Sequence, residues 1–232
     1  YFFLQLTFAL HYAKKAKVPL EKAIAICTNL RRRLNLSTPG GTARWDEFLA
    51  RVCESRDHPD ELRSTWNEFY EALHQPAASS PFGCFCYEQP NAAGVVRIHF
   101  LPPAAITSRP LAASCADARA SELREMFRHI SRTEKGAVSG LGISWLYNLE
   151  AYNRLFPAPY VASIRRPWFP LHLTGSSTWG QVLDWRQQVK PAMREKLLCN
   201  LQHLKPDTPW EVFPLEAKVT TCEIEAFYEL FA

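Results

Sequence analysis

The chain has 232 residues, 47% of them hydrophobic and 22% charged, which is typical of a globular protein and excludes disorder over most of its length. The net charge of +4 is uneven, because residues 1–36 hold seven lysines and arginines and one acidic residue, which gives this segment +6 and the remainder −2. Such a basic end is typical of a polyanion-binding surface or of the solvated face of two helices. We favour the solvated face and do not expect nucleic-acid binding, because a charge run alone is weak evidence.

The cysteines and the N-terminal run indicate the compartment. Seven scattered cysteines do not form the even-numbered framework of a disulfide-rich secreted domain, so we expect free thiols in the cytoplasm. The apolar run at residues 1–10 has no basic segment before it and no small-residue cleavage site after it. It is also shorter than the ~18 apolar residues that cross a membrane. We therefore expect neither a signal peptide nor membrane association.

Residues 1–76 are predicted to form a helical N-terminal subdomain. Apolar residues recur at helical spacing from Leu20 to Leu34, again after Thr42, which is expected to cap its helix, and again after Pro59. The small, proline-flanked stretch at 77–81 is predicted to be a linker.

Residues 82–232 are predicted to mix strands and helices. The expected elements are a hairpin from 83–88 and 95–101, a helix around 123–130, a strand within 136–147, a short helix at 149–156 and a strand at 160–165. Residues 167–189 are expected to be irregular, residues 191–201 helical and residues 212–219 extended. Thr220 and Glu223 are expected to form a capping box for the last helix. The pattern predicts an α+β fold: one globular domain over 1–232, in which the helical part packs with a mixed sheet-and-helix part at 82–232.

Most common catalytic and cofactor motifs are absent. Phosphate-binding loops need glycine, because backbone amides must approach the ligand closely, and the chain has only nine glycines. Gly140 and Gly142 form an isolated G-x-G, with Trp145 where a third glycine would stand. No H-E-x-x-H, G-x-S-x-G or C-x-x-C occurs. No catalytic residue, metal or cofactor is therefore assigned.

The hairpin offers one candidate cluster. Side chains alternate along strands, so Phe85, Tyr87, Val96, Ile98 and Phe100 should share the apolar face. The opposite face should then carry Cys84, Cys86, Glu88, Arg97 and His99. Thiols beside an imidazole are typical of a nucleophile pair or part of a metal site. Because free cysteine is often a small buried hydrophobe, we favour the structural interpretation here.

A second candidate site lies where a strand is expected to pass into a helix, at 144–157. Trp145, Tyr147 and Tyr152 could line a pocket, and Asn148, Glu150 and Arg154 could supply its polar contacts. Glu150 and Arg154 are four residues apart and so could pair on a helix. The alternative is that Asn148 only caps the helix and the aromatic residues belong to the core.

The turn at 174–181 is a weaker candidate. Its hydroxyl side chains and glycines could form an anion-binding turn, but such compositions are also ordinary connections.

Two stretches carry a resemblance to known proteins. The 144–157 segment, together with Trp179-Gly-Gln181 and the following Val189-Lys-Pro191, resembles a bacterial protein family with no assigned activity. The order hairpin, helix, strand, short helix, strand is similar to the core of acyl-CoA-dependent N-acetyltransferases, which implies a transferase-like topology. That family has a glycine-containing pyrophosphate loop before its central helix, whereas residues 101–122 contain no glycine.

Three functional hypotheses follow. The first is a small-molecule-binding protein or transferase-like enzyme with a pocket near 144–154. The second is a protein-interaction module without catalysis. The third is a nucleic-acid binder that uses the basic N-terminal helices, and it lacks the interleaved aromatic residues of single-strand binding surfaces. The sequence leaves the ligand, the reaction type and the oligomeric state open.

Overall fold

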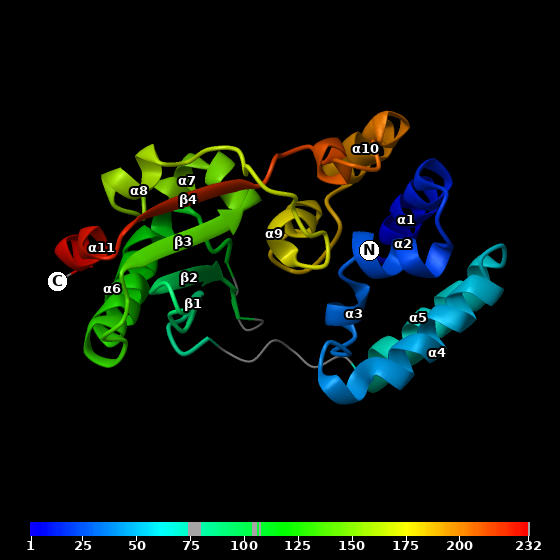
Figure 1. Ribbon diagram of the computed structural model, residues 1–232, viewed down its shortest axis with the longest axis horizontal. Coiled ribbons are helices and arrows are strands. Elements are labelled where there is room, and N and C mark those ends of the chain that lie inside the picture. The colour runs from blue at the N-terminus through cyan, green and yellow to red at the C-terminus, as the bar shows by residue number, and fades with distance from the viewer. Residues whose placement is uncertain (74–79, 104–105, 107, 232) are drawn as a thin grey trace. The chain divides into compact units, whose positions relative to one another are not determined.

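The structure is a computed structural model that describes residues 1–73, 80–103, 106 and 108–231 (Figure 1). Helices and a four-stranded sheet make up an α+β fold, which confirms the predicted class. The chain divides into two compact units, one of residues 1–76 and 169–214, the other of residues 77–168 and 215–232. Residues 169–214, expected to belong to the mixed part, thus cluster with the N-terminal helices. Positions 77–79 of the expected linker at 77–81 lie outside the described residues.

The first unit begins with five helices: α1 (Phe2–Ala16), α2 (Leu20–Cys27), α3 (Leu30–Arg33), α4 (Thr42–Glu54) and α5 (Pro59–Leu73). Aromatic rings join three of them, since Phe2 stacks on Trp66 at 5.0 Å between ring centroids and Phe48 lies 5.2 Å from Phe69. Thr42 is the first helical residue of α4 and makes no capping bond, so the expected cap is wrong. Its hydroxyl accepts a hydrogen bond from Arg31 instead.

Residues 169–214 complete the first unit around Trp179. They contain α9 (Ser176–Trp179) and α10 (Pro191–Asn200), so the stretch expected to be irregular holds a helical turn. The Trp179 ring is fully buried, 5.3 Å from Phe8 and 4.8 Å from Phe213. Its indole Nε1 donates to the backbone carbonyl of Cys27 at 3.0 Å. A second core of this unit therefore joins residues far apart in sequence.

The second unit holds the sheet, whose strands are β1 (Phe85–Glu88), β2 (Val95–Phe100), β3 (Ser139–Ser144) and β4 (Lys218–Glu223), in that order. The predicted hairpin is confirmed, because β1 and β2 pair antiparallel. β2 and β3 pair in parallel through the crossover helix α6 (Ala116–Thr133), and β3 pairs antiparallel with β4. The β2–β3 register ends at Arg97 and Leu141, and the two strands diverge towards their C-terminal ends (Figure 1).

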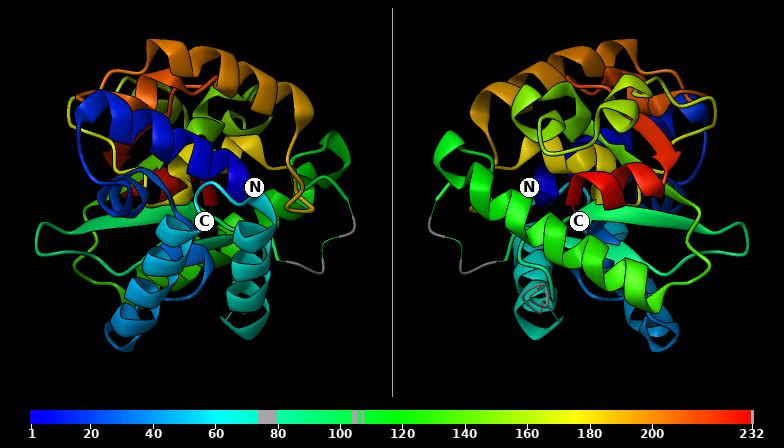
Figure 2. Two further views of the ribbon diagram at one scale, coloured as in Figure 1. Left: turned by 90° about the vertical axis from the view of Figure 1, so that its right-hand side faces the viewer. Right: turned by 90° about the vertical axis from the view of Figure 1, so that its left-hand side faces the viewer.

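Helices α6 and α11 (Glu225–Phe231) lie next to each other on one face of the sheet (Figure 2). Apolar residues at helical spacing on α6 point into the core, and the ring of Phe127 stacks on that of Phe227 at 4.4 Å. A Cβ at Gly140 of β3 would meet the Phe227 ring, so this glycine lets α11 approach the sheet closely.

Two local predictions in this unit are wrong, and a third is right only in part. The expected strand at 160–165 is replaced by α8 (Ala158–Ala162) and an isolated bridge between Arg165 and Val219. The expected helix at 149–156 is only α7 (Glu150–Asn153). Thr220 and Glu223 form no capping box, because β4 runs through both. The Thr220 hydroxyl instead donates to the backbone carbonyl of Tyr160.

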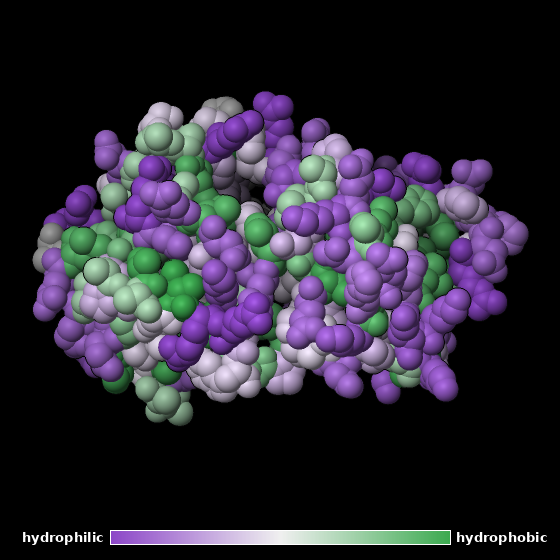
Figure 3. Space-filling model, turned by 90° about the horizontal axis from the view of Figure 1, so that it is seen from above, coloured by the Kyte–Doolittle hydropathy of each residue, from purple (hydrophilic) through white to green (hydrophobic). Residues whose placement is uncertain are grey.

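No helix in the described ranges is both long enough and apolar enough to cross a membrane. Figure 3 shows small hydrophobic areas bordered by hydrophilic residues. The exposed large hydrophobic side chains of the described chain are scattered, at Leu10, Ile26, Leu101, Val138, Trp168 and Leu230.

Candidate functional site

The tyrosines of the 144–157 segment lie in the core of the second unit. Tyr147 and Tyr152 are 2% and 1% exposed, with their rings 5.3 Å apart. The Tyr147 hydroxyl hydrogen-bonds that of Tyr160 at 2.8 Å. Burial raises the pKa of all three phenols well above the usual value, so they remain neutral. Tyr147 and Tyr152 therefore belong to the core of this unit, while Trp145 is partly buried against the same core.

Asn148 does not have the expected capping role. β3 ends at Ser144, whose hydroxyl accepts from the Leu146 amide at 3.1 Å and so caps the short 3₁₀ turn Trp145–Asn148. The Asn148 amide nitrogen donates to the backbone carbonyls of Trp145 and Glu216. α7 begins after Leu149 without a side-chain cap. Asn148 thus ties this turn to the residues before β4, and a helix as short as α7 offers no anion site.

The structure does not pair Glu150 with Arg154. Both side chains are exposed, and neither forms an ion pair within the described chain. Arg154 follows the end of α7 and lines a cavity of about 230 Å³ in the second unit. None of the other residues expected around the pocket lines this cavity.

The cavity combines charge with an apolar wall. Ala116, Ala120 and Arg124 follow one another at four-residue spacing along one face of α6. The full lining is Ala116, Asp117, Ala120, Arg124, Arg154, Leu155, Leu230 and Phe231. The side chains of Asp117, Arg124 and Arg154 are all exposed. None of the three forms a hydrogen bond or ion pair with the described residues.

Asp117 and Arg124 were missed because both belong to the solvent face of a helix that was predicted from its buried face. The alternation of alanine with charged residues at the start of α6 was the available signal. This alternation predicts a polar helix surface, but it does not show that Arg154 and the C-terminal helix complete a cavity there.

The hairpin brings part of the thiol and imidazole cluster together. Cys86 is paired with His99 and Glu88 with Arg97 in the β1–β2 register. His99 Nε2 lies 2.8 Å from Glu88 Oε1, and Arg97 Nη1 lies 4.0 Å from it. Cys84 precedes β1 and is buried in the core beside α6. Among the residues with a described position, no three His, Cys, Asp or Glu side chains are placed to hold a metal ion.

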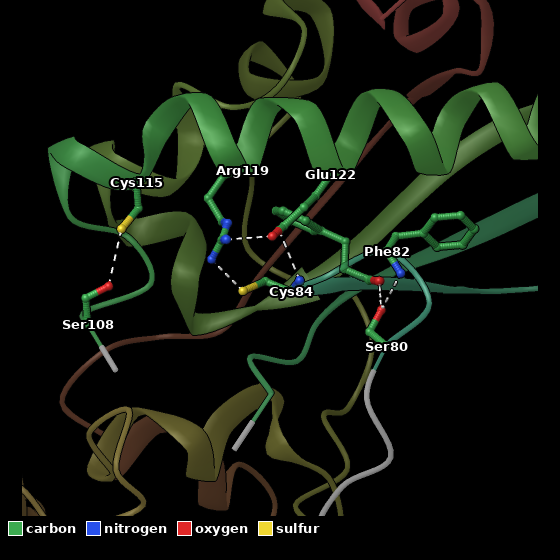
Figure 4. A network of polar contacts seen from close by, with 8 residues as sticks. Ser80, Phe82, Cys84, Ser108, Cys115, Arg119 and Glu122 are labelled. Atoms are coloured by element: carbon green, nitrogen blue, oxygen red, sulfur yellow. Dashed lines mark hydrogen bonds and ion pairs between the residues drawn. The ribbon is translucent and has the colours of Figure 1, made fainter. Parts of the chain in front are cut away.

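Cys84 belongs to a buried polar network with α6 (Figure 4). Arg119 donates to the Cys84 sulfur at 2.6 Å and to Glu122 Oε1 at 2.5 Å, and Glu122 Oε2 accepts from the Cys84 amide at 3.0 Å. Burial raises the pKa of the Cys84 thiol to about 12, with Glu122 adding to the effect. The thiolate is the reactive form, so the raised pKa of Cys84 and its contacts with α6 favour an anchoring role for this cysteine.

The 174–181 turn and the basic N-terminal segment both make contacts inside the first unit. In the 174–181 turn, Thr178, Trp179 and Gln181 are buried. Of the basic residues in α3, Arg33 lies over the Tyr1 ring at 4.7 Å and donates to Gln187, while Arg31 donates to the backbone carbonyl of Leu36. Two of the arginines of α3, Arg31 and Arg33, therefore take part in contacts within the unit.

Comparison with known proteins identifies no relative: no family model, no curated protein and no solved structure matches the chain.

Proposed function

We propose that this protein binds a small organic anion in the cavity formed by α6, α11 and the residues after α7. The observation that carries the proposal is that Arg124 and Arg154, two arginines without an ion-pair partner among the described residues, line one cavity. Guanidinium groups present a planar set of donors that fits carboxylate or phosphate oxygens. Leu155, Leu230 and Phe231 supply an apolar surface next to these charges.

The size of the cavity limits the ligand. A volume of about 230 Å³ corresponds to roughly eight water molecules at about 30 Å³ each. It is smaller than the roughly 300–1,000 Å³ typical of pockets for drug-sized ligands. The proposed ligand is therefore a compact metabolite and not a dinucleotide or an acyl-CoA.

The transferase-like hypothesis has topological support only. The β2–α6–β3 crossover and the divergence of β2 from β3 agree with the resemblance to the N-acetyltransferase core. The glycine-free stretch 101–122 and the small cavity argue against an acyl-CoA cofactor. We therefore propose ligand binding and leave catalysis out of the proposal.

We place the protein in the bacterial cytoplasm as part of the same proposal. The bacterial origin rests on the sequence resemblance. The reducing compartment is supported by the seven cysteines, all of which are free thiols in the structure.

The alternative of a protein-interaction module without catalysis expects the aromatic residues in the core or at an interface, and the burial of Tyr147 and Tyr152 agrees with it. We prefer ligand binding because Arg124 and Arg154 line one cavity. The nucleic-acid alternative is weakened by the internal contacts of Arg31 and Arg33.

A calorimetric titration tests the proposal. Short aliphatic carboxylates and phosphate monoesters are titrated into the wild-type chain and into R124A, R154A and R128A. Arg128 is the matched control, since it is an exposed arginine of α6 outside the cavity. We expect binding to the wild type and R128A and a loss of about tenfold or more in each cavity variant, because a hydrogen bond to a charged group contributes about 1.5–3 kcal/mol. No binding, or equal affinity in all four proteins, would refute the proposal.

A further inference from the structure

We infer that the ligand of this cavity is a zwitterion with an apolar side chain, that is, a free aliphatic α-amino acid. The inference rests on the proposed function and specifies its ligand class. If the cavity held only the two positive charges of Arg124 and Arg154, any small anion would complement it. The cavity also contains Asp117, an exposed carboxylate with no hydrogen-bond or ion-pair partner among the described residues.

The positions of the charges on α6 suit a compact zwitterion. Asp117 and Arg124 are seven residues apart on α6 and lie on one side of it, about 10.5 Å apart along the axis at 1.5 Å per residue. Helical side chains tend to lean towards the N-terminus, a tendency that favours the approach of the long Arg124 side chain to Asp117. The two nevertheless form no ion pair in the described chain. An ammonium group at Asp117 and a carboxylate at the arginines would satisfy both ends of the site.

The remaining lining selects the side chain of the amino acid. Leu155 and Phe231 are 6% and 4% exposed and form a fixed apolar wall, and Leu230 is 49% exposed beside them. An aliphatic side chain would bury part of the exposed surface of Leu230, whereas glycine would not. The cavity of about 230 Å³ corresponds to roughly eight water volumes of about 30 Å³ each. This is close to the size of a single aliphatic amino acid and too small for a peptide.

The experiment compares ligands that each lack one feature of leucine. L-leucine, 4-methylpentanoate (no ammonium), leucinamide (no carboxylate) and glycine (no side chain) are titrated into the wild type, D117N, R154A and the control R128A. In the wild type we expect leucine to bind about tenfold or more tightly than 4-methylpentanoate and leucinamide, the range expected when a charge-assisted hydrogen bond is removed. Glycine should also bind more weakly than leucine, because it buries no apolar surface. In D117N, leucine and 4-methylpentanoate should bind equally. In R154A, both should bind about tenfold more weakly than they bind to the wild type.

The outcomes separate the two proposals. If 4-methylpentanoate binds the wild type as tightly as leucine does, and D117N changes neither affinity, the zwitterion inference is overturned while anion binding stands. If no ligand binds the wild type, or R154A and R128A bind them equally, anion binding at this cavity fails and the inference fails with it. Circular dichroism of D117N and R154A shows whether each variant keeps the native fold.

Discussion

Gly142 of β3 shows how one residue without a side chain shapes the core of the second unit. A Cβ at this position would collide with the hydroxyl oxygens of Tyr147 and Tyr160, which are hydrogen-bonded to each other. Both rings are buried and held by neighbouring aromatic residues, so neither can move aside cheaply. The glycine is therefore required by close packing and not by its backbone conformation.

We predict that G142A lowers the free energy of unfolding by about 1–3 kcal/mol, the cost typical of overpacking a core. G136A is the matched control, because a Cβ there would meet nothing within 4 Å. Urea unfolding followed by fluorescence measures both. Equal stability of the two variants would contradict the packing role of Gly142.

The buried thiol of Cys84 gives a pH-dependent prediction. Its pKa is raised to about 12 by burial, above the unfolded value of 9.0, so the folded chain keeps a proton that the unfolded chain releases. The stabilisation is complete below pH 9.0 and is lost as the pH rises towards about 12. C84S retains an acceptor for Arg119 but does not titrate in this range. The stability difference between wild type and C84S should therefore shrink from pH 8 to pH 10.5; a constant difference in urea unfolding would contradict the raised pKa.

At the level of elements, the start of β1 depends on α6 through Glu122. This carboxylate accepts from Arg119 and from the Cys84 amide, and the side chains of Arg119 and Glu122 are 9% and 19% exposed. Removing one partner leaves a mostly buried charge and an unpaired amide, so we predict that E122A costs about 3–5 kcal/mol of unfolding free energy. E125A, on the exposed face of the same helix, should change it by less than about 0.5 kcal/mol. Thermal unfolding of the two variants compares them, and similar melting temperatures would refute the anchoring role.

The elements that the sequence predicted well are those whose pattern is local. The hairpin around residues 89–94 and the helix with Leu123, Met126 and Phe127 on one face follow from alternation and helical spacing. Thr220 was wrongly predicted to cap a helix. It and its β-branched neighbours pair with β3, whose residues are about 80 positions earlier in the sequence. The same limit applies to the site: Arg154 was singled out from its segment, but its neighbours Asp117 and Arg124 come from a helix that only folding brings close.

At the level of the whole molecule, the first unit is built from two separate stretches of chain. Leu4, Phe8 and Cys27 of the N-terminal helices share a core with residues of 169–214, among them Trp179 and Phe213. No periodicity within residues 1–76 could reveal this shared core, because the partner residues come after residues 77–168, which belong to the second unit. The N-terminal helices should therefore need residues 169–214 for a closed core.

Trp179 tests that dependence in the full chain. It is fully buried between Phe8 and Phe213, and its indole nitrogen donates to Cys27. We predict that W179A loses about 3–5 kcal/mol of stability, the usual cost of truncating a large core aromatic residue. W168A is the matched control, because Trp168 is 68% exposed and its cation–π contact with Arg165 contributes only about 0.5–1 kcal/mol. Hydrogen exchange monitored by mass spectrometry should show faster exchange in α1 and α2 of W179A only. Unchanged protection of α1 and α2 in W179A would mean that the N-terminal helices fold without the 169–214 segment.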